Sequence, residues 1–167
     1  MTSKTTGHNN NKNTHEKSFA TVKYNEQKKG KALHALCPFK EGDVITPFFA
    51  QEVFSEPNYL TLQLDAHRHI TLLPEGLAFT NHSCAPNIFF DTTSMLVIAL
   101  KPIETGDELT FFYPSTEWDM AQTFECQCGA ENCLHWISGA KFIDPKILNG
   151  YRLTDFIQSS IKKKNAG

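Results

Sequence analysis

The sequence predicts a mainly β domain in which small antiparallel sheets are joined by turns and short helices, with one helix at the carboxy end. Apolar segments are short and are interrupted by Gly, Pro and Asp, as expected for strands rather than long helices. Leu60, Leu62 and Leu64 alternate with Thr61 and Gln63, which is the two-residue period of a half-buried strand. Since no segment of helical length separates the apolar runs, neighbouring strands should pair in the antiparallel sense.

Eight apolar runs are expected to form these strands. Two of them follow a Gly-Asp pair, at Gly42 and Gly106, and each pair supplies a turn directly before the strand. In chain order the runs are residues 19–22, 32–36, 44–49, 59–64, 70–73, 87–90, 95–100 and 108–113.

A single helix with a basic tail is expected over residues 144–167. Asp144 can cap its amino end, and Pro145 suits its first turn, whereas Gly150 weakens the pattern. The lysine run at residues 162–164 is interpreted as a solvated helix end. Apolar residues recur at roughly helical spacing, namely Ile147, Leu148, Tyr151, Phe156, Ile157 and Ile161.

Composition limits the class of protein. A chain of 167 residues that is 40% hydrophobic is long enough for one globular domain. Residues 1–17 are rich in Asn, Thr and Lys, so we expect a disordered polar tail. No segment is long and apolar enough for a membrane span, and a net charge of -2 argues against strong nucleic-acid binding.

Five cysteines, an odd number without a signal peptide, predict reduced thiols and an intracellular location, cytoplasmic or nuclear. Cys126, Cys128 and Cys133 lie within eight residues around a glycine. Three thiolates this close can fold onto one zinc ion, which prefers four ligands in a tetrahedron. Spacing alone leaves the fourth ligand open among three candidates, Cys84, Cys37 and His135.

Two further motifs precede the cysteine cluster. The first reads Asn-His-Ser-Cys-Ala-Pro-Asn at residues 81–87, and the second reads Glu-Leu-Thr-Phe-Phe-Tyr at residues 108–113. Together with Cys-x-Cys-x4-Cys at residues 126–133, they resemble the SET-domain protein lysine methyltransferases that carry a post-SET zinc module. The segment 30–35 resembles the cofactor loop of the same family, so the resemblance covers about residues 19–140.

The resemblance implies a fold and a metal site. It implies the SET-domain β-clip fold with a knot-like carboxy-terminal segment, with the SET domain at residues 18–113 and a connection with the zinc module at residues 114–143. It also implies that Cys84 completes the tetrahedron with Cys126, Cys128 and Cys133. The zinc would then be structural, one ion without an open position, and Cys37 would be a buried or free thiol.

The resemblance implies an S-adenosylmethionine-dependent enzyme in which Tyr113 is the catalytic residue. The tyrosine hydroxyl would lie near the transferred methyl group and the attacking nitrogen. By the same resemblance, the substrate channel is formed by Phe79, Phe111 and Tyr113. The cofactor-binding residues implied are Lys31, Ala32, Leu33, Asn81, His82, Tyr113, Trp136 and Ile137. By the same resemblance, phenylalanine at position 111 would favour the addition of more than one methyl group.

Four positions depart from the family pattern. Ala32 replaces the second glycine of the cofactor loop and adds a methyl group where the backbone approaches the ligand. Phe112 stands where an acidic residue is common, Pro114 where glycine is usual, and His135 where glycine is frequent.

The leading interpretation is therefore a protein-lysine N-methyltransferase. Its substrate would be a protein or peptide with a basic, lysine-containing segment, such as a histone tail or a non-histone protein. The acidic side chains that could line a groove for it are Asp65, Glu75, Asp91, Glu117 and Asp119. The alternative is a catalytically inactive SET-fold module that binds a peptide or partner.

Overall fold

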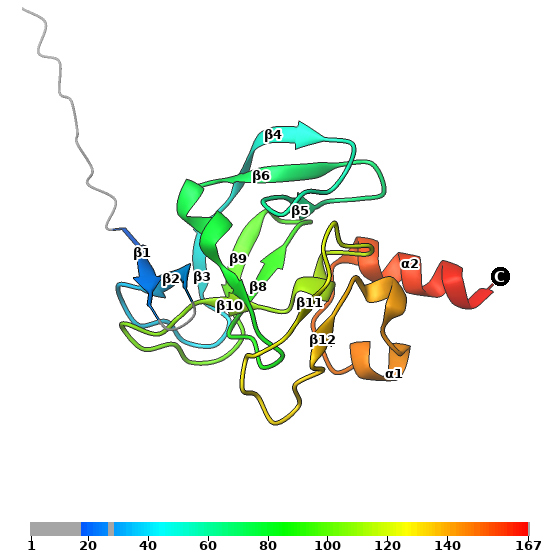
Figure 1. Cartoon of the computed structure of the whole chain (residues 1–167). Helices are drawn as coiled ribbons and strands as arrows, with labels where there is room; N and C mark the ends of the chain where they lie inside the picture. Colours follow the sequence, from blue (N-terminus) through cyan, green and yellow to red (C-terminus); the bar gives the residue numbers. More distant parts are fainter. Residues whose placement is uncertain (1–17, 27–28, 167) are drawn as a thin grey trace, which may run out of the picture.

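Five small sheets of two or three strands form the framework of the part of the chain that the structure describes (Figure 1). The computed structural model describes residues 18–26 and 29–166. The predicted disordered tail at residues 1–17 lies outside the described residues. Four of the five sheets are purely antiparallel, which confirms the predicted mainly β fold of small antiparallel sheets.

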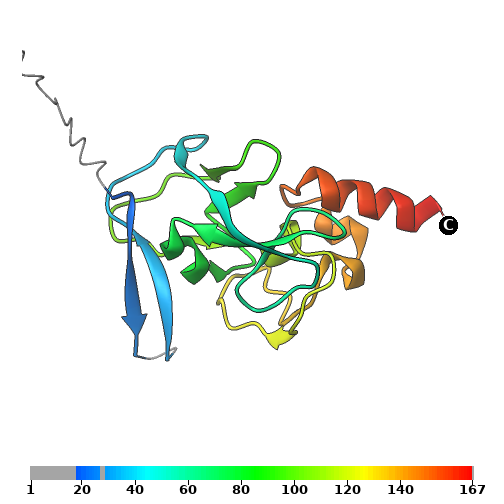
Figure 2. The same ribbon diagram turned by 90° about the horizontal axis from the view of Figure 1, so that it is seen from above.

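The first sheet is a hairpin of β1 (Ala20–Asn25) and β2 (Gly30–Ala35), paired in register from Ala20↔Ala35 to Asn25↔Gly30. Its β2 strand is joined to the segment that precedes residue 110, because the backbone N–H of Leu109 donates to the carbonyl of Leu33 at 2.7 Å. In Figure 2 this hairpin and helix α2 (Asp155–Ala166) lie at opposite ends of the molecule.

Two three-stranded sheets hold most of the main core. One has the order β3 (Val44–Pro47), β9 (Leu96–Ala99), β8 (Ile88–Asp91), and the other has the order β4 (Phe49–Phe54), β6 (His69–Leu73), β5 (Leu62–Gln63). The predicted runs at residues 19–22, 32–36, 70–73, 87–90 and 95–100 all overlap strands of the hairpin or of these sheets.

The predicted run 44–49 is two strands rather than one. Phe48 lies between them and is fully buried, with its ring edge-on to Phe90 at 5.5 Å between centroids. Its backbone N–H donates to the carbonyl of Met95. The chain therefore leaves one sheet and enters the other at this anchored aromatic residue.

The prediction of a strand over residues 59–64 is wrong for residues 59–61. Only Leu62–Gln63 form a strand, whereas the side chain of Asn58 accepts the backbone N–H of Leu60 in a tight turn. Tyr59 is 79% exposed and Leu60 is 40% exposed, so neither packs on the core. A local hydrogen bond from Asn58 outweighs the alternating pattern here.

The expectation that all strands pair antiparallel is also wrong at one place. After the 3-10 turn η1 (Glu75–Phe79), β7 (Asn81–His82) pairs in parallel with β10 (Thr110–Phe111). The pairing joins the two motifs that are nearly thirty residues apart in sequence, with Thr110 opposite Asn81 and Phe111 opposite His82. Long-range pairing of this kind leaves no trace in local periodicity.

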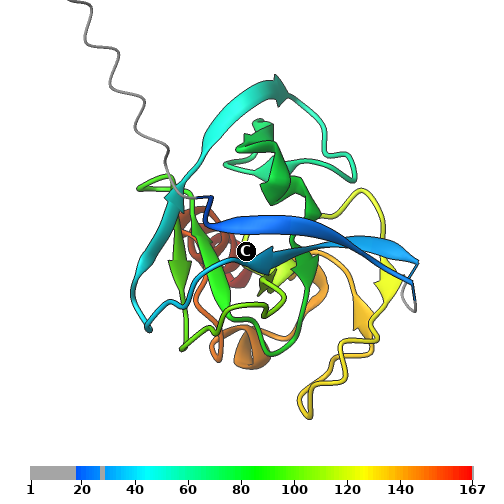
Figure 3. The same ribbon diagram turned by 90° about the vertical axis from the view of Figure 1, so that its left-hand side faces the viewer.

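The carboxy-terminal part begins with η2 (Tyr113–Ser115), followed by β11 (Phe124–Glu125), β12 (Trp136–Ile137) and η3 (Ala140–Phe142). β11 and β12 pair antiparallel, and the loop between them projects from one side of the molecule (Figure 3).

The single predicted terminal helix is wrong, because the chain forms two. Asp144 caps α1 (Pro145–Leu148) as predicted by accepting the N–H of Lys146, and the turn at Gly150 then ends it. The Thr154 hydroxyl accepts the N–H of Ile157 at the start of α2. Gly150, which weakens the helical pattern in the sequence, therefore lies at the break between the two helices.

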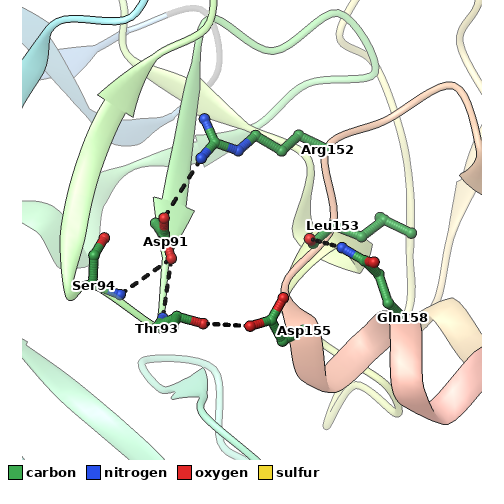
Figure 4. Close-up of polar contacts among 7 residues, drawn as sticks. All are labelled: Asp91, Thr93, Ser94, Arg152, Leu153, Asp155 and Gln158. Carbon is green, nitrogen blue, oxygen red and sulfur yellow. Dashed lines mark hydrogen bonds and ion pairs between the residues drawn. The ribbon is translucent and has the colours of Figure 1, made fainter.

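Side-chain contacts hold α2 against the β8–β9 hairpin (Figure 4). Asp91 accepts the backbone N–H of Thr93 and pairs with Arg152 at 3.5 Å, while the Thr93 hydroxyl donates to Asp155 at 2.9 Å. The Arg152 guanidinium also lies 4.6 Å from the centroid of the Phe89 ring. The carboxy-terminal helix is thus attached to the domain by polar contacts as well as by apolar ones.

A second core cluster lies under α1 and α2. It contains Phe112, Leu148, Leu153 and Ile157, all buried, and Phe112 stacks on Tyr151. Among the described residues, no helix has the length and apolar character required to span a bilayer.

Candidate active site and metal centre

A cavity of about 710 Å³ opens beside the parallel β7–β10 pair. Its walls come from the β1–β2 hairpin, the 57–62 loop, the β7 and β10 strands, and the 120–128 segment. The two sequence motifs and the cysteine segment therefore meet around one space, although they are far apart along the chain.

Tyr113 follows β10 and lines this cavity. Its hydroxyl donates to the backbone carbonyl of Thr80 at 3.1 Å. Burial raises the pKa of Tyr113 to about 12, and the negative charges of Glu117 and Glu108 add to the shift. The phenol therefore stays protonated at neutral pH and acts as a fixed hydrogen-bonding group.

His82 connects Tyr113 to the cysteine cluster. Its Nδ1 accepts the backbone N–H of Tyr113 at 3.2 Å, and its Nε2 lies 3.3 Å from the Sγ of Cys84. Burial lowers the pKa of His82 to about 4, so the ring is neutral and its single proton resides on Nε2, directed at the sulfur.

Asn81 connects the same strand to the amino-terminal hairpin. Its Nδ2 donates to the backbone carbonyl of Lys31 at 3.1 Å and to Oε1 of Glu108 at 2.9 Å. This bridge fixes the distance between the hairpin and β7, and so fixes the cavity wall between them.

Five of the predicted cofactor and channel residues line the cavity, namely Lys31, Asn81, His82, Phe111 and Tyr113, and so do two of the predicted zinc ligands, Cys126 and Cys128. Ala32 and Leu33 are almost fully buried in the core beneath the hairpin. Phe79 lies outside the lining with its ring 4.8 Å from the Nζ of Lys31. At the β12 strand, Ile137 is fully buried and Trp136 is 58% exposed.

The cavity is also lined by residues that belong to none of the sequence motifs. Thr80, Leu77 and Leu62 contribute to its walls, and so does Glu117. Glu117 stood among the acidic residues proposed for a peptide groove, but no local signal marks it as buried beside Tyr113. Three other acids of that group are paired at the surface, Asp65 with Arg68, Asp119 with Lys141 and Asp91 with Arg152.

Four thiols gather on one side of the cavity. The Sγ atoms of Cys84, Cys126, Cys128 and Cys133 all lie within 4.8 Å of one another, and those of Cys84 and Cys126 are 4.0 Å apart. A tetrahedral zinc with bonds of about 2.3 Å requires sulfurs about 3.8 Å apart, so this set fits the ion. Cys37 is exposed and takes no part.

Backbone amides surround these sulfurs as expected for thiolate ligands. The N–H groups of Leu134 and His135 point at the sulfurs of Cys84 and Cys133, each at 3.4 Å. His135 has a positive φ of 60°, a conformation that glycine, the frequent residue here in the family, adopts without strain. Its backbone N–H, rather than its ring, contacts the cluster.

The thiols differ in their acidity. Burial raises the pKa of Cys84 to about 11. Burial also opposes ionisation of Cys128, but the N–H groups of Cys84 and Ala130 outweigh it and lower the pKa of that thiol to about 6. Burial raises the pKa of Cys126 as well, so of these three thiols only Cys128 favours the thiolate form before a metal binds.

Comparison with known proteins identifies the class. The model of the SET domain family matches residues 30–114, and the chain belongs to this family. The predicted SET fold is thereby confirmed.

Methyltransferase flvH of Aspergillus flavus is 41% identical over 108 residues, which cover 64% of this chain and 60% of that protein. A histone-lysine N-methyltransferase, H3 lysine-36 specific, of Debaryomyces hansenii is 30% identical over 96 residues, or 54% of this chain and 13% of that protein. The chain thus spans about three fifths of the first relative and a small part of the second.

Among solved structures, the chain is similar to the crystal structure of KRYPTONITE in complex with mCHG DNA and SAH. The TM-score is 0.54 at 24% identity, and the match covers 69% of this chain and 28% of that one. This likeness supports the fold.

Proposed function

We propose that the protein transfers methyl groups from S-adenosylmethionine to a lysine side chain of a protein substrate. The observation that carries this proposal is the single cavity that Asn81, His82 and Tyr113 line together, next to the hairpin and the thiol cluster. The names of the two relatives and the SAH in the neighbouring structure support the same reaction class.

The cavity fits the cofactor in size and in polarity. A volume of about 710 Å³ lies within the range of cofactor sites, about 300–1,000 Å³. Lys31, Asn81 and His82 would hold the cofactor at the β2–β7 side, where polar backbone and side-chain groups are concentrated. S-adenosylmethionine, when bound, supplies a methyl group on a positively charged sulfur.

The residues of the chain would orient the target amine and exclude water. Tyr113 presents a hydroxyl whose position is set by its bond to the Thr80 carbonyl. The Phe111 ring lies 4.7 Å from the Tyr113 ring and adds an apolar wall. An amine held between such groups reacts at a high effective concentration.

The thiol cluster would hold one structural zinc ion. Cys126 and Cys128 line the cavity as well as belonging to the cluster, while Cys84 belongs to the segment that follows β7. A metal bound to all four thiols would therefore fasten the 124–137 segment to the cavity wall. Four protein ligands leave no open position for catalysis by the metal.

This function implies a division of the chain that we also propose. Residues 18–113 would form the SET domain, 114–143 the connection and zinc module, and 144–167 a carboxy-terminal attachment. The substrate would be a protein with a basic lysine-containing segment, and a reducing cytoplasmic or nuclear compartment would keep the four thiols available for zinc.

The test is direct transfer of a labelled methyl group. Zinc-loaded protein is incubated with labelled S-adenosylmethionine, a panel of histones and cell extract, and modified residues are located by mass spectrometry. Methylated lysine in at least one protein is expected. Label in no protein, with folded and zinc-loaded enzyme, would contradict the proposal.

A further inference from the structure

Glu117 is a buried carboxyl group on the wall of the same cavity. The residue is 8% exposed, and its Oε1 accepts the backbone N–H of Gln63 at 2.9 Å and the Thr116 hydroxyl at 3.0 Å. Both hydrogen bonds go to one oxygen. Within residues 18–26 and 29–166, Oε2 accepts no hydrogen bond.

No cation of the described residues lies within 4 Å of this carboxyl group. Asp119, the acidic residue next along the chain, differs from Glu117 because it is paired with a cation, Lys141. Burial raises the pKa of Glu117 to about 7, against which the two hydrogen bonds act. A buried carboxylate without a counter-ion is unfavourable, so a site that retains one is suited to a cationic ligand.

The position of Glu117 is fixed from two sides. The backbone N–H of Ala140 donates to its carbonyl at 2.9 Å, and that of Lys141 donates to the carbonyl of Trp118 at 3.0 Å. This close approach requires Gly139, because a Cβ there would overlap the Trp118 carbonyl. On the other side, Gln63 accepts the N–H of Trp118 through its side chain at 2.8 Å.

The surroundings of Glu117 in the cavity suit an alkylammonium group. Leu62, Leu72 and Leu77 supply apolar walls for a methylene chain, and Tyr113 lines the same space. Thr80 also lines the cavity, and its hydroxyl is buried with no hydrogen-bond partner among the described residues. The charge of Glu117 reaches Tyr113, whose acidity it reduces.

We propose that Glu117 binds the ammonium head of the target lysine in this cavity and accepts its proton before methyl transfer. This inference rests on the function proposed above. It assigns Glu117 a catalytic role in addition to that of Tyr113.

The proton transfer balances without another reactant. The ammonium nitrogen loses one proton to Oε2, which gives a neutral amine with a free lone pair and a neutral carboxyl group. Away from water both charged partners are destabilised, which favours the neutral pair. The carboxyl group returns the proton to solvent when the product leaves.

The experiment compares two small probes that differ only in the ammonium group. N-acetyl-lysine methylamide and its norleucine counterpart are titrated by NMR into zinc-loaded protein saturated with S-adenosylhomocysteine at pH 7.5. Wild type should bind the lysine probe about tenfold to a hundredfold more tightly, and Glu117→Gln should bind both alike. Asp119→Asn, an exposed neighbour, is the matched control and should keep the preference.

An unchanged preference in Glu117→Gln overturns the inference while leaving the proposed function in place. Absence of cofactor binding and of any methyl transfer by wild type would instead contradict the proposed function.

If Glu117→Gln does not fold, the preference of wild type is measured between pH 6 and 8.5. It should grow through about pH 7 as Glu117 ionises, and a flat ratio overturns the inference. Neutral His82 and protonated Tyr113 keep their states over this interval. The other titratable groups that line the cavity include Lys31, Glu125 and the thiols of Cys126 and Cys128, which bound zinc would keep as thiolates. Beyond the lining lie Asp65, His69, Glu108 and the exposed Asp119–Lys141 pair, and the pKa values of Asp65 and His69 are lowered.

Discussion

Phe112→Ala should detach the carboxy-terminal helices and destabilise the protein strongly. The Phe112 ring is 2% exposed and stacks on Tyr151 with centroids 3.7 Å apart and planes 6° apart. The Tyr151 hydroxyl donates to the carbonyl of Cys84 at 2.9 Å and accepts from Asn132 at 3.0 Å. One aromatic pair therefore connects the β10 segment, the thiol cluster and the segment that joins α1 to α2.

The size of the effect follows from burial. Replacing a buried Phe by Ala costs about 3–5 kcal/mol, including the cavity that remains. For a chain of this length each kcal/mol lowers the melting temperature by about 2–4 °C. The variant should therefore melt about 6–20 °C below wild type.

The assay is thermal unfolding of zinc-loaded protein followed by circular dichroism. Phe142→Ala is the matched control, because Phe142 is 60% exposed and its loss should change the melting temperature by about 2 °C at most. If Phe112→Ala melts together with Phe142→Ala, the stacked pair does not attach the terminal helices and this reasoning is refuted.

Three further predictions concern the metal, the product and pH. Cys126→Ser should release the bound zinc, measured by elemental analysis, while exposed Cys37→Ser retains it; full zinc content in the first variant would contradict the metal site. Wild type should proceed beyond monomethyl-lysine, and Phe111→Tyr should give fewer methyl groups, because an added hydroxyl can hold water where a methylated amine must turn; time-resolved peptide mass spectra showing monomethylation by both proteins would oppose this. The pKa of Glu117 is raised in the folded state from 4.5 to about 7, so native protein binds more protons than unfolded protein and loses stability as pH rises between these values. Glu117→Gln should therefore raise the melting temperature relative to wild type at pH 8 more than at pH 5, and an equal difference at both would count against a buried carboxylate.

The sequence predicted a strand correctly where an apolar run is bounded by turn residues. The runs that became β6, β8 and β9 combine apolar side chains with turn residues at their ends. The pattern failed at residues 59–64, where Asn58 forms a turn, and at Gly150, where the terminal helix divides. At Asn58 a side-chain hydrogen bond determines the backbone, and at Gly150 a glycine inside the periodic segment lies where the helix ends.

The candidate site was partly predictable because its motifs are short and contiguous. The cysteine spacing implied a metal, and the resemblance supplied Cys84, which the structure brings to the other three thiols. The parallel pairing of β7 with β10 and the burial of Glu117 were not predictable. Both depend on contacts between segments distant in sequence, such as Gln63 with Glu117, which no local pattern encodes.

The most direct test of the central claim compares wild type with Tyr113→Phe in methyl transfer to the protein substrate identified by mass spectrometry. The substitution removes one hydroxyl, bonded to the Thr80 carbonyl, and little volume. Transfer should fall on the order of 10²-fold or more, while S-adenosylhomocysteine binding, measured by calorimetry, stays close to that of wild type. Unchanged turnover in Tyr113→Phe would contradict the assignment of this cavity as the site of methyl transfer.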